Sequence, residues 1–364
     1  MILAFVQLGP NPAVLLPPFA SYARRSLPEA DLVLISDRKR AGRTFPGRVV
    51  LYSKADRPRW IGAYERKFPA ESSLARGFWV RSIERLFALR LLASKDSGPL
   101  VHLESDVISF ANATIMRQLR SAYSRPAVPK STAGEACASF LYVPDTDGLE
   151  RMLCHMEERL MDAAQPLNDM ALLGMGLRDG SIDVLPGHPH EATEAIAYKS
   201  ESGALPVIFD AAPYGGYLFG RDPIHSQGNS ISGYVHPGLP NYIQASSWGL
   251  TPLESPDGTF LHVPTVETRM SRVAFAALHV SAKYDPGETS PDSRQWGRVL
   301  GEANGTRPRR PHRPDQRSVH NYGVGARSMA RRAIFEVPGR WARRLGKLDS
   351  GRVTVHKRGK RRGS

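Results

Sequence analysis

The sequence has 364 residues, 41% of them hydrophobic, which is enough for one or two domains with a sizeable core. It contains no apolar run long enough to predict a transmembrane helix, and its apolar start, Met1–Leu8, fits a first buried strand better than a signal peptide. The two cysteines, Cys137 and Cys154, provide neither a disulfide framework nor a zinc spacing, so we expect a cytoplasmic protein.

The net charge of +14 is concentrated at the C-terminal end of the sequence. Residues 307–364 contain 18 Lys and Arg against three acids, whereas residues 1–306 contain 31 basic and 32 acidic residues. The body is therefore nearly neutral, and the high pI carries no information about the ligand that the body binds.

Apolar segments alternate with helical patterns through the first part of the chain. Residues 54–76 are polar and mixed, which predicts a long loop with short helical pieces around Ile61–Phe68. Continuous apolar strands separated by helices are typical of a parallel sheet that is covered on both faces. The expected strands are Ile2–Leu8, Leu32–Asp37, Arg48–Ser53 and Leu100–Val107, and the expected helices are Pro12–Ser26 and Gly77–Ala93.

The alternation continues to about residue 284. Glycines punctuate the sequence from Gly215 to about residue 265, which predicts a long loop region. Asp145 or Thr146 is expected to cap the helix that the pattern predicts over Thr146–Met161. The expected elements are strands Ala136–Val143, Ile182–Leu185 and Val207–Asp210, helices Thr146–Met161 and Leu167–Leu177, and a strand or short helix over Val273–Val280. The predicted fold class is α/β, with a mostly parallel Rossmann-like sheet flanked by helices.

The composition changes after Tyr284, so we predict a folded domain over 1–284, a linker over 285–325 and a basic tail over 326–364. Pro, Gly, Ser, Arg and Asp dominate the linker. In the tail, Trp341, Leu345 and Leu348 share one helical face that is flanked by Arg and Lys, a pattern that suits an anionic membrane surface. The alternative is a disordered, solubilising tail.

The run Leu100–Val107 ends in two carboxylates, Glu104 and Asp106, one residue apart. Side chains alternate along a strand, so residues i and i+2 point the same way, and ligands of α/β sheets bind outside the carboxyl ends of the strands. Two carboxylates in such a place predict a site for a hard divalent cation that also holds a diphosphate. The alternative is a strand end with solvated acids.

The order of these parts over about residues 1–284 resembles the nucleotide-sugar-dependent glycosyltransferases of the GT-A fold. Glu104-Ser105-Asp106 is similar to the DXD signature of that group, although Glu replaces the first Asp. The resemblance implies a divalent cation, Mn²⁺ or Mg²⁺, a nucleotide-sugar donor and a glycan or lipid-linked acceptor. It also implies that Ser105 contributes to donor binding and that Asp37 contacts the base or ribose, although Asp37 could equally cap the following turn.

A second stretch, Leu278–Lys283, resembles the late His and Lys motif of several such families. The resemblance implies that His279 completes the metal shell and that Lys283 contacts the diphosphate. An imidazole ligand suits Mn²⁺ better than Mg²⁺, and Lys is a common partner of phosphate. The alternative for His279 is a core histidine on an apolar run.

Two carboxylates are candidates for the catalytic base. If the anomeric centre is inverted, one carboxylate must take the proton of the acceptor hydroxyl. Asp169 is the first candidate and Asp210 the second, with Asn168 beside the acceptor. Asp169 could instead be a helix N-terminal acid that complements the macrodipole.

The loop after residue 209 is rich in Gly, Tyr, Asp and His, as sugar-binding loops tend to be. Aromatic rings stack on sugars and polar groups bind their hydroxyls. The alternative is a set of tight turns that need Gly. The candidate substrate-binding residues are Tyr214, Gly215, Gly216, Tyr217 and His236.

These features together predict a metal-dependent glycosyltransferase, with a role in cell-envelope polysaccharide synthesis and a cytoplasmic location that includes the inner face of the membrane. Two alternatives remain open: a degenerate, non-catalytic sugar- or partner-binding protein, and a nucleic-acid-associated protein that binds through its basic tail. A hydrolase, an ATPase or a dehydrogenase is disfavoured, since the sequence lacks the Gly-x-Ser-x-Gly, His-Glu-x-x-His, Walker and Gly-x-Gly-x-x-Gly motifs.

Overall fold

The computed structural model describes one body of the chain, within the unit Met1–Arg307. The predicted linker and basic tail lie outside the described residues, as does the candidate amphipathic segment. The described residues are 1–9, 16–39, 44–69, 77–93, 98–131, 134–200, 203–212, 214–215, 248–254, 260–267 and 272–279.

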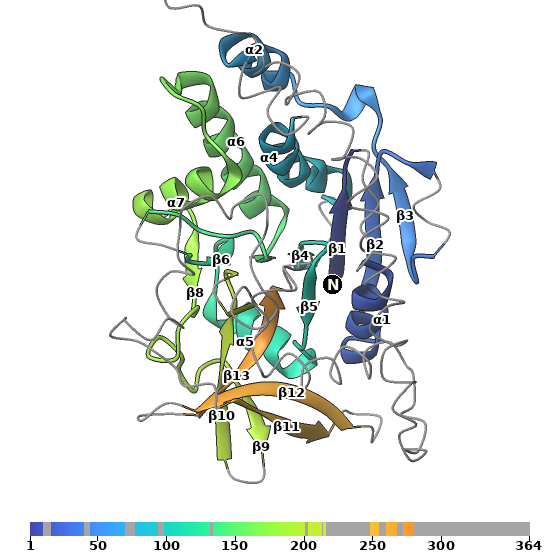
Figure 1. Ribbon diagram of the computed structural model, residues 1–364, viewed down its shortest axis with the longest axis vertical. Coiled ribbons are helices and arrows are strands. Elements are labelled where there is room, and N and C mark those ends of the chain that lie inside the picture. The colour runs from blue at the N-terminus through green and yellow to red at the C-terminus, as the bar shows by residue number, and fades with distance from the viewer. Residues whose placement is uncertain are drawn as a thin grey trace, which may run out of the picture. The chain divides into compact units, whose positions relative to one another are not determined.

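A seven-stranded sheet with the order β3-β2-β1-β4-β7-β6-β8 forms the centre of this body (Figure 1). Four of its pairings are parallel, and β7 alone runs antiparallel to both of its neighbours. The predicted α/β class with a mostly parallel sheet is therefore confirmed. The strands are β1 (Ile2–Gln7), β2 (Asp31–Ser36), β3 (Arg48–Leu51), β4 (Leu100–Leu103), β6 (Ala127–Pro129), β7 (Phe140–Val143) and β8 (Asp183–Leu185).

Helices cover both faces of the sheet because its strands are apolar on both sides. Leu3 and Phe5 of β1 belong to one core and Ala4 and Val6 to another, and all four are buried. α1 (Leu16–Ser26) and α5 (Ala113–Ala122) pack in the first core. α2 (Trp60–Lys67), α4 (Phe78–Ala88), α6 (Thr146–Asp162) and α7 (Asp169–Asp179) pack in the second, with the short 3₁₀ turns η2 (Lys54–Asp56) and η4 (Leu89–Leu92) next to α2 and α4 in the chain.

The helices that the sequence predicts most clearly are present, with shifted ends. The pattern over Gly77–Ala93 splits into α4 and η4, and the predicted Leu167–Leu177 helix is α7, which begins at Asp169. The cap of α6 is Asp145, whose Oδ1 accepts from the Gly148 N–H at 2.6 Å. None of the described helices is long and apolar enough to cross a membrane.

A second sheet corrects the prediction of a long loop that reaches residue 265. Its order is β11-β12-β13-β10-β9, and β5 pairs with β13. The prediction rested on the glycines that follow residue 214, but residues 248–254 and 260–267 form paired strands. The strands are β5 (Val107–Ser109), β9 (Ala197–Ser200), β10 (Gly203–Phe209), β11 (Trp248–Glu254), β12 (Phe260–Glu267) and β13 (Arg272–His279).

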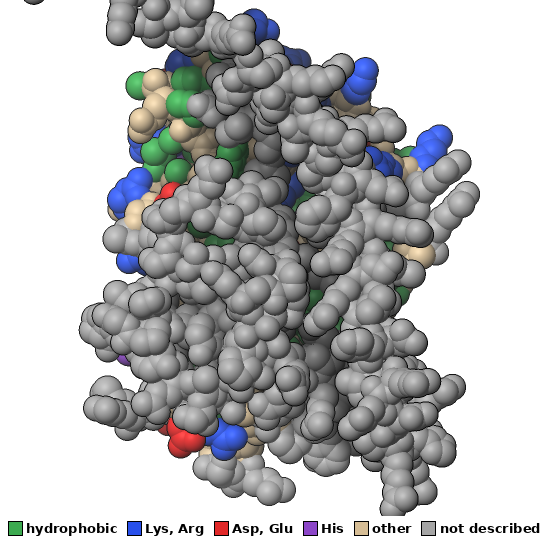
Figure 2. Space-filling view, in the orientation of Figure 1, with side chains coloured by type: hydrophobic (Ala, Val, Ile, Leu, Met, Phe, Trp, Pro, Cys, Tyr) green, Lys and Arg blue, Asp and Glu red, His purple; other side chains and the backbone are tan. Residues whose placement is uncertain are grey.

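Charged side chains of the described residues are visible at the edge of the space-filling view (Figure 2). On the face that Figure 2 draws, the described Lys and Arg side chains appear at several separate places along the outline.

Adjacent residues of β2 test the burial of both faces. Leu34 and Ile35 are both 0% exposed and belong to the two different cores. We expect Leu34→Ala and Ile35→Ala each to lower the free energy of unfolding by about 2–5 kcal/mol, measured by urea denaturation. If either substitution left the free energy of unfolding nearly unchanged, the burial of both faces of the sheet would be contradicted.

Candidate metal centre

Glu104 and Asp106 lie in a tight turn between β4 and β5, not on one strand as the sequence predicts. β4 ends at Leu103, and the Val107 N–H donates to the Glu104 carbonyl at 3.1 Å. The alternation argument for their common direction is therefore wrong. Their position is nevertheless the expected one, because β4 runs parallel to β1 and the turn follows its carboxyl end.

His279 is brought to these carboxylates by strand pairing between distant parts of the chain. It is the last residue of β13 and pairs with Val107 of β5, the residue after Asp106. Its Nε2 lies 3.2 Å from Oε2 of Glu104 and 3.3 Å from Oδ1 of Asp106. The imidazole therefore faces two carboxylates, and its role as a metal ligand stays a prediction.

The three side chains fit the requirements of a divalent cation. One ligand atom from each lies within 4.8 Å of the others. Cis ligands of an octahedral ion at about 2.1 Å are about 3 Å apart, which is close to the 3.2 Å and 3.3 Å of the imidazole–carboxylate contacts. Two carboxylates and an imidazole suit Mn²⁺. The buried Nδ1 of His279 has no hydrogen-bond partner among the described residues. The polar contacts of the ring are those of Nε2 with Glu104 and Asp106.

The charges in this cluster are strongly coupled. Burial alone would raise the pKa of the Glu104 carboxyl, but Arg85 and His279 hold it well below its usual range. Burial alone would lower the pKa of His279, but Asp106 and Glu104 raise it well above its ordinary value. The imidazole thus compensates negative charge that a divalent cation would otherwise balance.

Arg85 is a member of this cluster that sequence reasoning missed. Its Nη2 donates to Oε1 of Glu104 and, at 2.7 Å, to Oδ2 of Asp169. Ser82, one turn earlier on α4, donates from Oγ to Oδ1 of Asp169 at 3.0 Å. Ser82 and Arg85, three positions apart on α4, were the available signal, although Arg81 and Glu84 of the same helix are polar too.

The structure places Asn168 and Asp169 at the N-terminus of α7. The Asn168 side chain caps the helix by accepting from the Ala171 N–H at 2.8 Å. Asp169 is 4% exposed and accepts from Ser82 and Arg85. It therefore does more than complement the macrodipole, because it joins α7 to α4.

Asp210 organises the main chain around His279. It follows β10, is 0% exposed, and its carboxylate accepts N–H groups from Tyr214 at 3.1 Å, Gly215 at 2.8 Å and His279 at 3.1 Å. Burial raises its pKa to about 6, against the opposing effects of His279 and these N–H donors. Tyr214 is also fully buried, with its ring against Phe275, so its ring packs in the core and is not exposed for sugar stacking.

The remaining predicted residues are divided between the described and undescribed parts of the chain. Asp37 follows the carboxyl end of β2, and its Oδ2 accepts from the Gly9 N–H at 3.0 Å beside β1. Ser105 lies in the turn between the two carboxylates. The positions predicted for phosphate and sugar contacts at Lys283, Gly216, Tyr217 and His236 lie outside the described residues.

Comparison with known proteins gives likeness to solved structures only. No family model and no curated protein sequence matches the chain. The PaToxG glycosyltransferase is 12% identical over 49% of this chain and 68% of that chain, with a TM-score of 0.34. Mouse xyloside xylosyltransferase 1 is 10% identical over 51% and 84%, with a TM-score of 0.33. The galactosyltransferase LgtC, in complex with donor and acceptor sugar analogs, is 12% identical over 51% and 74%, with a TM-score of 0.30. A likeness of this extent says nothing of the ligands of this chain.

Gly215 tests the close approach that holds His279. A Cβ at this position would lie 1.4 Å from the His279 carbonyl oxygen, so the main chain must shift to accept it. We expect Gly215→Ala to lower the melting temperature by several degrees, measured by calorimetry. Gly62→Ala, in helix α2, is the matched control and is expected to be neutral or stabilising. Equal effects of the two substitutions would contradict the contact.

Proposed function

We propose that this chain is a divalent-metal-dependent glycosyltransferase, which moves a sugar from a nucleotide-sugar donor to a glycan or lipid-linked acceptor. The observation that carries the proposal is the convergence of Glu104, Asp106 and His279 beyond the carboxyl end of β4. Ligands of α/β sheets bind at this edge, and a diphosphate leaving group needs positive charge there.

Glu104, Asp106 and His279 would hold the cation, with Mn²⁺ favoured over Mg²⁺ by the imidazole. When bound, the cation would offset charge on the leaving nucleoside diphosphate. Glu in place of the first Asp of a DXD motif keeps the same charge. Its carboxylate reaches the imidazole at 3.2 Å, so the longer side chain is compatible with a shared ligand position.

Arg85 would supply a second, permanent positive charge beside the metal ligands. Its guanidinium is 22% exposed and already bridges Glu104 and Asp169, so it is oriented before any donor binds. A guanidinium presents several N–H donors in a fixed plane, which suits phosphate or sugar oxygens. We propose Lys283 as a further phosphate contact and Ser105 as a donor-binding residue.

Asp169 and Asp210 receive different roles. Both oxygens of Asp169 accept hydrogen bonds, and each keeps a second lone pair for an acceptor hydroxyl. We keep it as the first candidate for contact with the acceptor hydroxyl, together with Asn168. Asp210 is fully buried and satisfied by three main-chain donors, and we assign it to hold the main chain of His279.

The nucleotide would lie over the ends of β1 and β2. Asp37 is partly exposed there, and its carboxylate holds the Gly9 N–H, with Nη1 of Arg81 3.9 Å away. Gly9 has a φ of 101°, a conformation that favours glycine and lets the main chain approach a ligand closely. We propose that Asp37 binds the base or ribose of the donor.

Metal-dependent donor binding tests the proposal. We expect titration calorimetry with a panel of sugar nucleotides to show Mn²⁺-dependent binding of one donor, and Asp106→Ala or His279→Ala to weaken it by about 100-fold, because each removes a metal ligand. Glu158→Ala, an exposed acid of α6, is the control and should leave binding unchanged. Mn²⁺-independent binding, or equal affinity in all variants, would overturn the metal site.

Turnover separates an enzyme from a non-catalytic sugar-binding protein. We expect the donor that binds to be hydrolysed slowly or transferred, measured by release of the nucleoside diphosphate. Arg85→Ala should lower this rate by about 100-fold, since it removes positive charge from the leaving-group side, whereas Arg85→Lys should recover part of it. Binding without any release of nucleoside diphosphate would favour the non-catalytic alternative.

A further inference from the structure

One tyrosine hydroxyl binds both main-chain groups of the residue before the α7 cap. Tyr64 of α2 donates to the Leu167 carbonyl at 2.8 Å and accepts from the Leu167 N–H at 2.7 Å. The Tyr64 side chain is 3% exposed, so these bonds are shielded from water. A hydroxyl can donate and accept at the same time, and here it uses both capacities on one residue.

Leu167 lies next to the residues that connect α7 to the candidate metal centre. Asn168 caps α7, and Asp169 holds Arg85, which contacts Glu104. A continuous series of contacts therefore runs from Tyr64 through Leu167, Asp169 and Arg85 to Glu104. A shift at Leu167 moves the start of α7 and, with it, the carboxylate that orients Arg85.

The rings of Trp60, Tyr64 and Phe87 join α2, which carries Tyr64, to α4, which carries Arg85. The Trp60 ring lies 6.0 Å from that of Tyr64 and 5.2 Å from that of Phe87 on α4. α4 carries Ser82 and Arg85, the two partners of Asp169. The packing of α2 on α4 therefore sets the distance between the hydroxyl that holds Leu167 and the guanidinium that holds Asp169.

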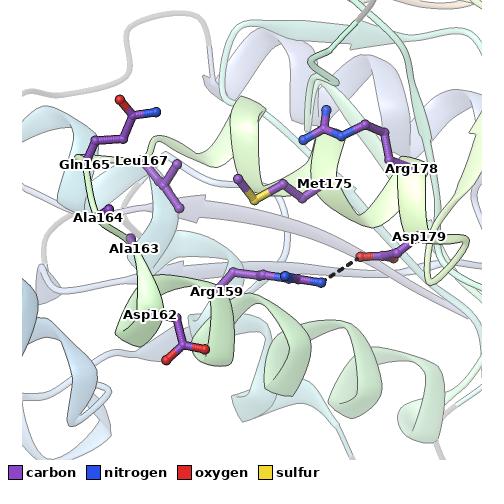
Figure 3. A pocket seen from close by; sticks show the side chains of 9 residues that line it. All are labelled: Arg159, Asp162, Ala163, Ala164, Gln165, Leu167, Met175, Arg178 and Asp179. Atoms are coloured by element: carbon purple, nitrogen blue, oxygen red, sulfur yellow. Dashed lines mark ion pairs between the residues drawn. The ribbon is translucent and has the colours of Figure 1, made fainter.

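The other side of the segment 163–167 borders open space. It forms part of the wall of a pocket of about 650 Å³ between α6 and α7, in which Arg159 points toward Asp179 (Figure 3). These two side chains are 3.8 Å apart, and Asp179 also lies 2.6 Å from His155. Leu167 and Ala163 are buried in the second core, and the hydrogen bonds to Tyr64 fix the main chain of the segment in addition to that packing.

We propose that Tyr64 is a positioning residue for the Asp169–Arg85–Glu104 network, which it controls from α2 through the main chain of Leu167. The inference rests on the proposed function, in which Arg85 acts on the donor. The hydroxyl binds the main chain of Leu167 and acts through it. It sets the place of the Asp169 carboxylate, and through it the direction of the Arg85 guanidinium.

Tyr64→Phe tests this role, since it removes the hydroxyl and keeps the ring. We expect kcat for release of the nucleoside diphosphate to fall about tenfold while KM for the donor changes less than twofold. The reason is that the Arg85 guanidinium loses its orientation, whereas the residues that bind the donor keep theirs. Tyr198→Phe is the matched control: Tyr198 is equally buried, and its hydroxyl donates to the Phe110 carbonyl at 2.8 Å. We expect no change in kcat for that variant.

A double-mutant cycle with Asp169→Asn distinguishes positioning from general loss of stability. If Tyr64 acts through Asp169, Tyr64→Phe should lower kcat less than twofold in the Asp169→Asn background. Additive losses, or an equal loss of kcat in Tyr198→Phe, would overturn the proposal.

The cycle remains informative if the wild-type protein binds or turns over no donor, in which case the proposed function has failed. The four proteins of the cycle are then compared by melting temperature. A shift for the double variant smaller than the sum of the single shifts supports the coupling, and additive shifts overturn it.

Discussion

The pairing of β5 with β13 is the interaction on which the candidate site depends. Val107, Ile108 and Ser109 pair with His279, Leu278 and Ala277, and the N–H groups of Phe110 and Ala111 continue the contact to the Ala276 carbonyl. β5 follows the turn that carries both carboxylates, while β13 ends in the imidazole. Strand pairing thus places Nε2 of His279 3.2 Å from Oε2 of Glu104 and 3.3 Å from Oδ1 of Asp106, although these residues are far apart in the sequence.

Asp210 completes this arrangement from the interior. Its buried carboxylate gathers three main-chain N–H groups, one of which belongs to His279, and Gly215 permits the approach because it lacks a Cβ. A buried carboxylate without such partners would be costly, so the turn after β10 and the end of β13 are stable only together. The position of the imidazole therefore depends on β10, on the turn that follows it and on β13, and not on a single loop.

On the opposite side, the network of Arg85 and Asp169 connects the metal ligands to the helices. α4 and α7 both belong to the core that packs on one face of the sheet, and they present Arg85 and Asp169 toward Glu104. Buried ion pairs add little net stability, but they fix geometry when each charge has its partner. Glu104 thus has the Arg85 guanidinium on the helix side and the His279 imidazole on the side of the second sheet.

Sequence reasoning succeeded where periodicity or residue chemistry was strong. β1, β2 and α6 follow from unbroken patterns. Glu104 and Asp106 were selected by residue type and position, and His279 by the resemblance to a late His and Lys motif. The structure brings these three side chains together, and their role as metal ligands stays a prediction. Sequence reasoning failed where tertiary context decides the outcome. The loop predicted from glycines after residue 214 was extended in error over β11 and β12, and the turn after Leu103 replaced the expected strand alternation. The roles of Arg85 and Tyr64 depend on distant partners, which no local pattern can reveal.

The most direct measurement is anomalous diffraction at the manganese edge from crystals grown with Mn²⁺. The account predicts one strong peak about 2.2 Å from a carboxylate oxygen of Glu104, an oxygen of Asp106 and Nε2 of His279. Such a peak would establish the three side chains as a metal shell. A peak at other residues, or none at saturating Mn²⁺, would contradict the central claim that this junction of two sheets is a metal centre.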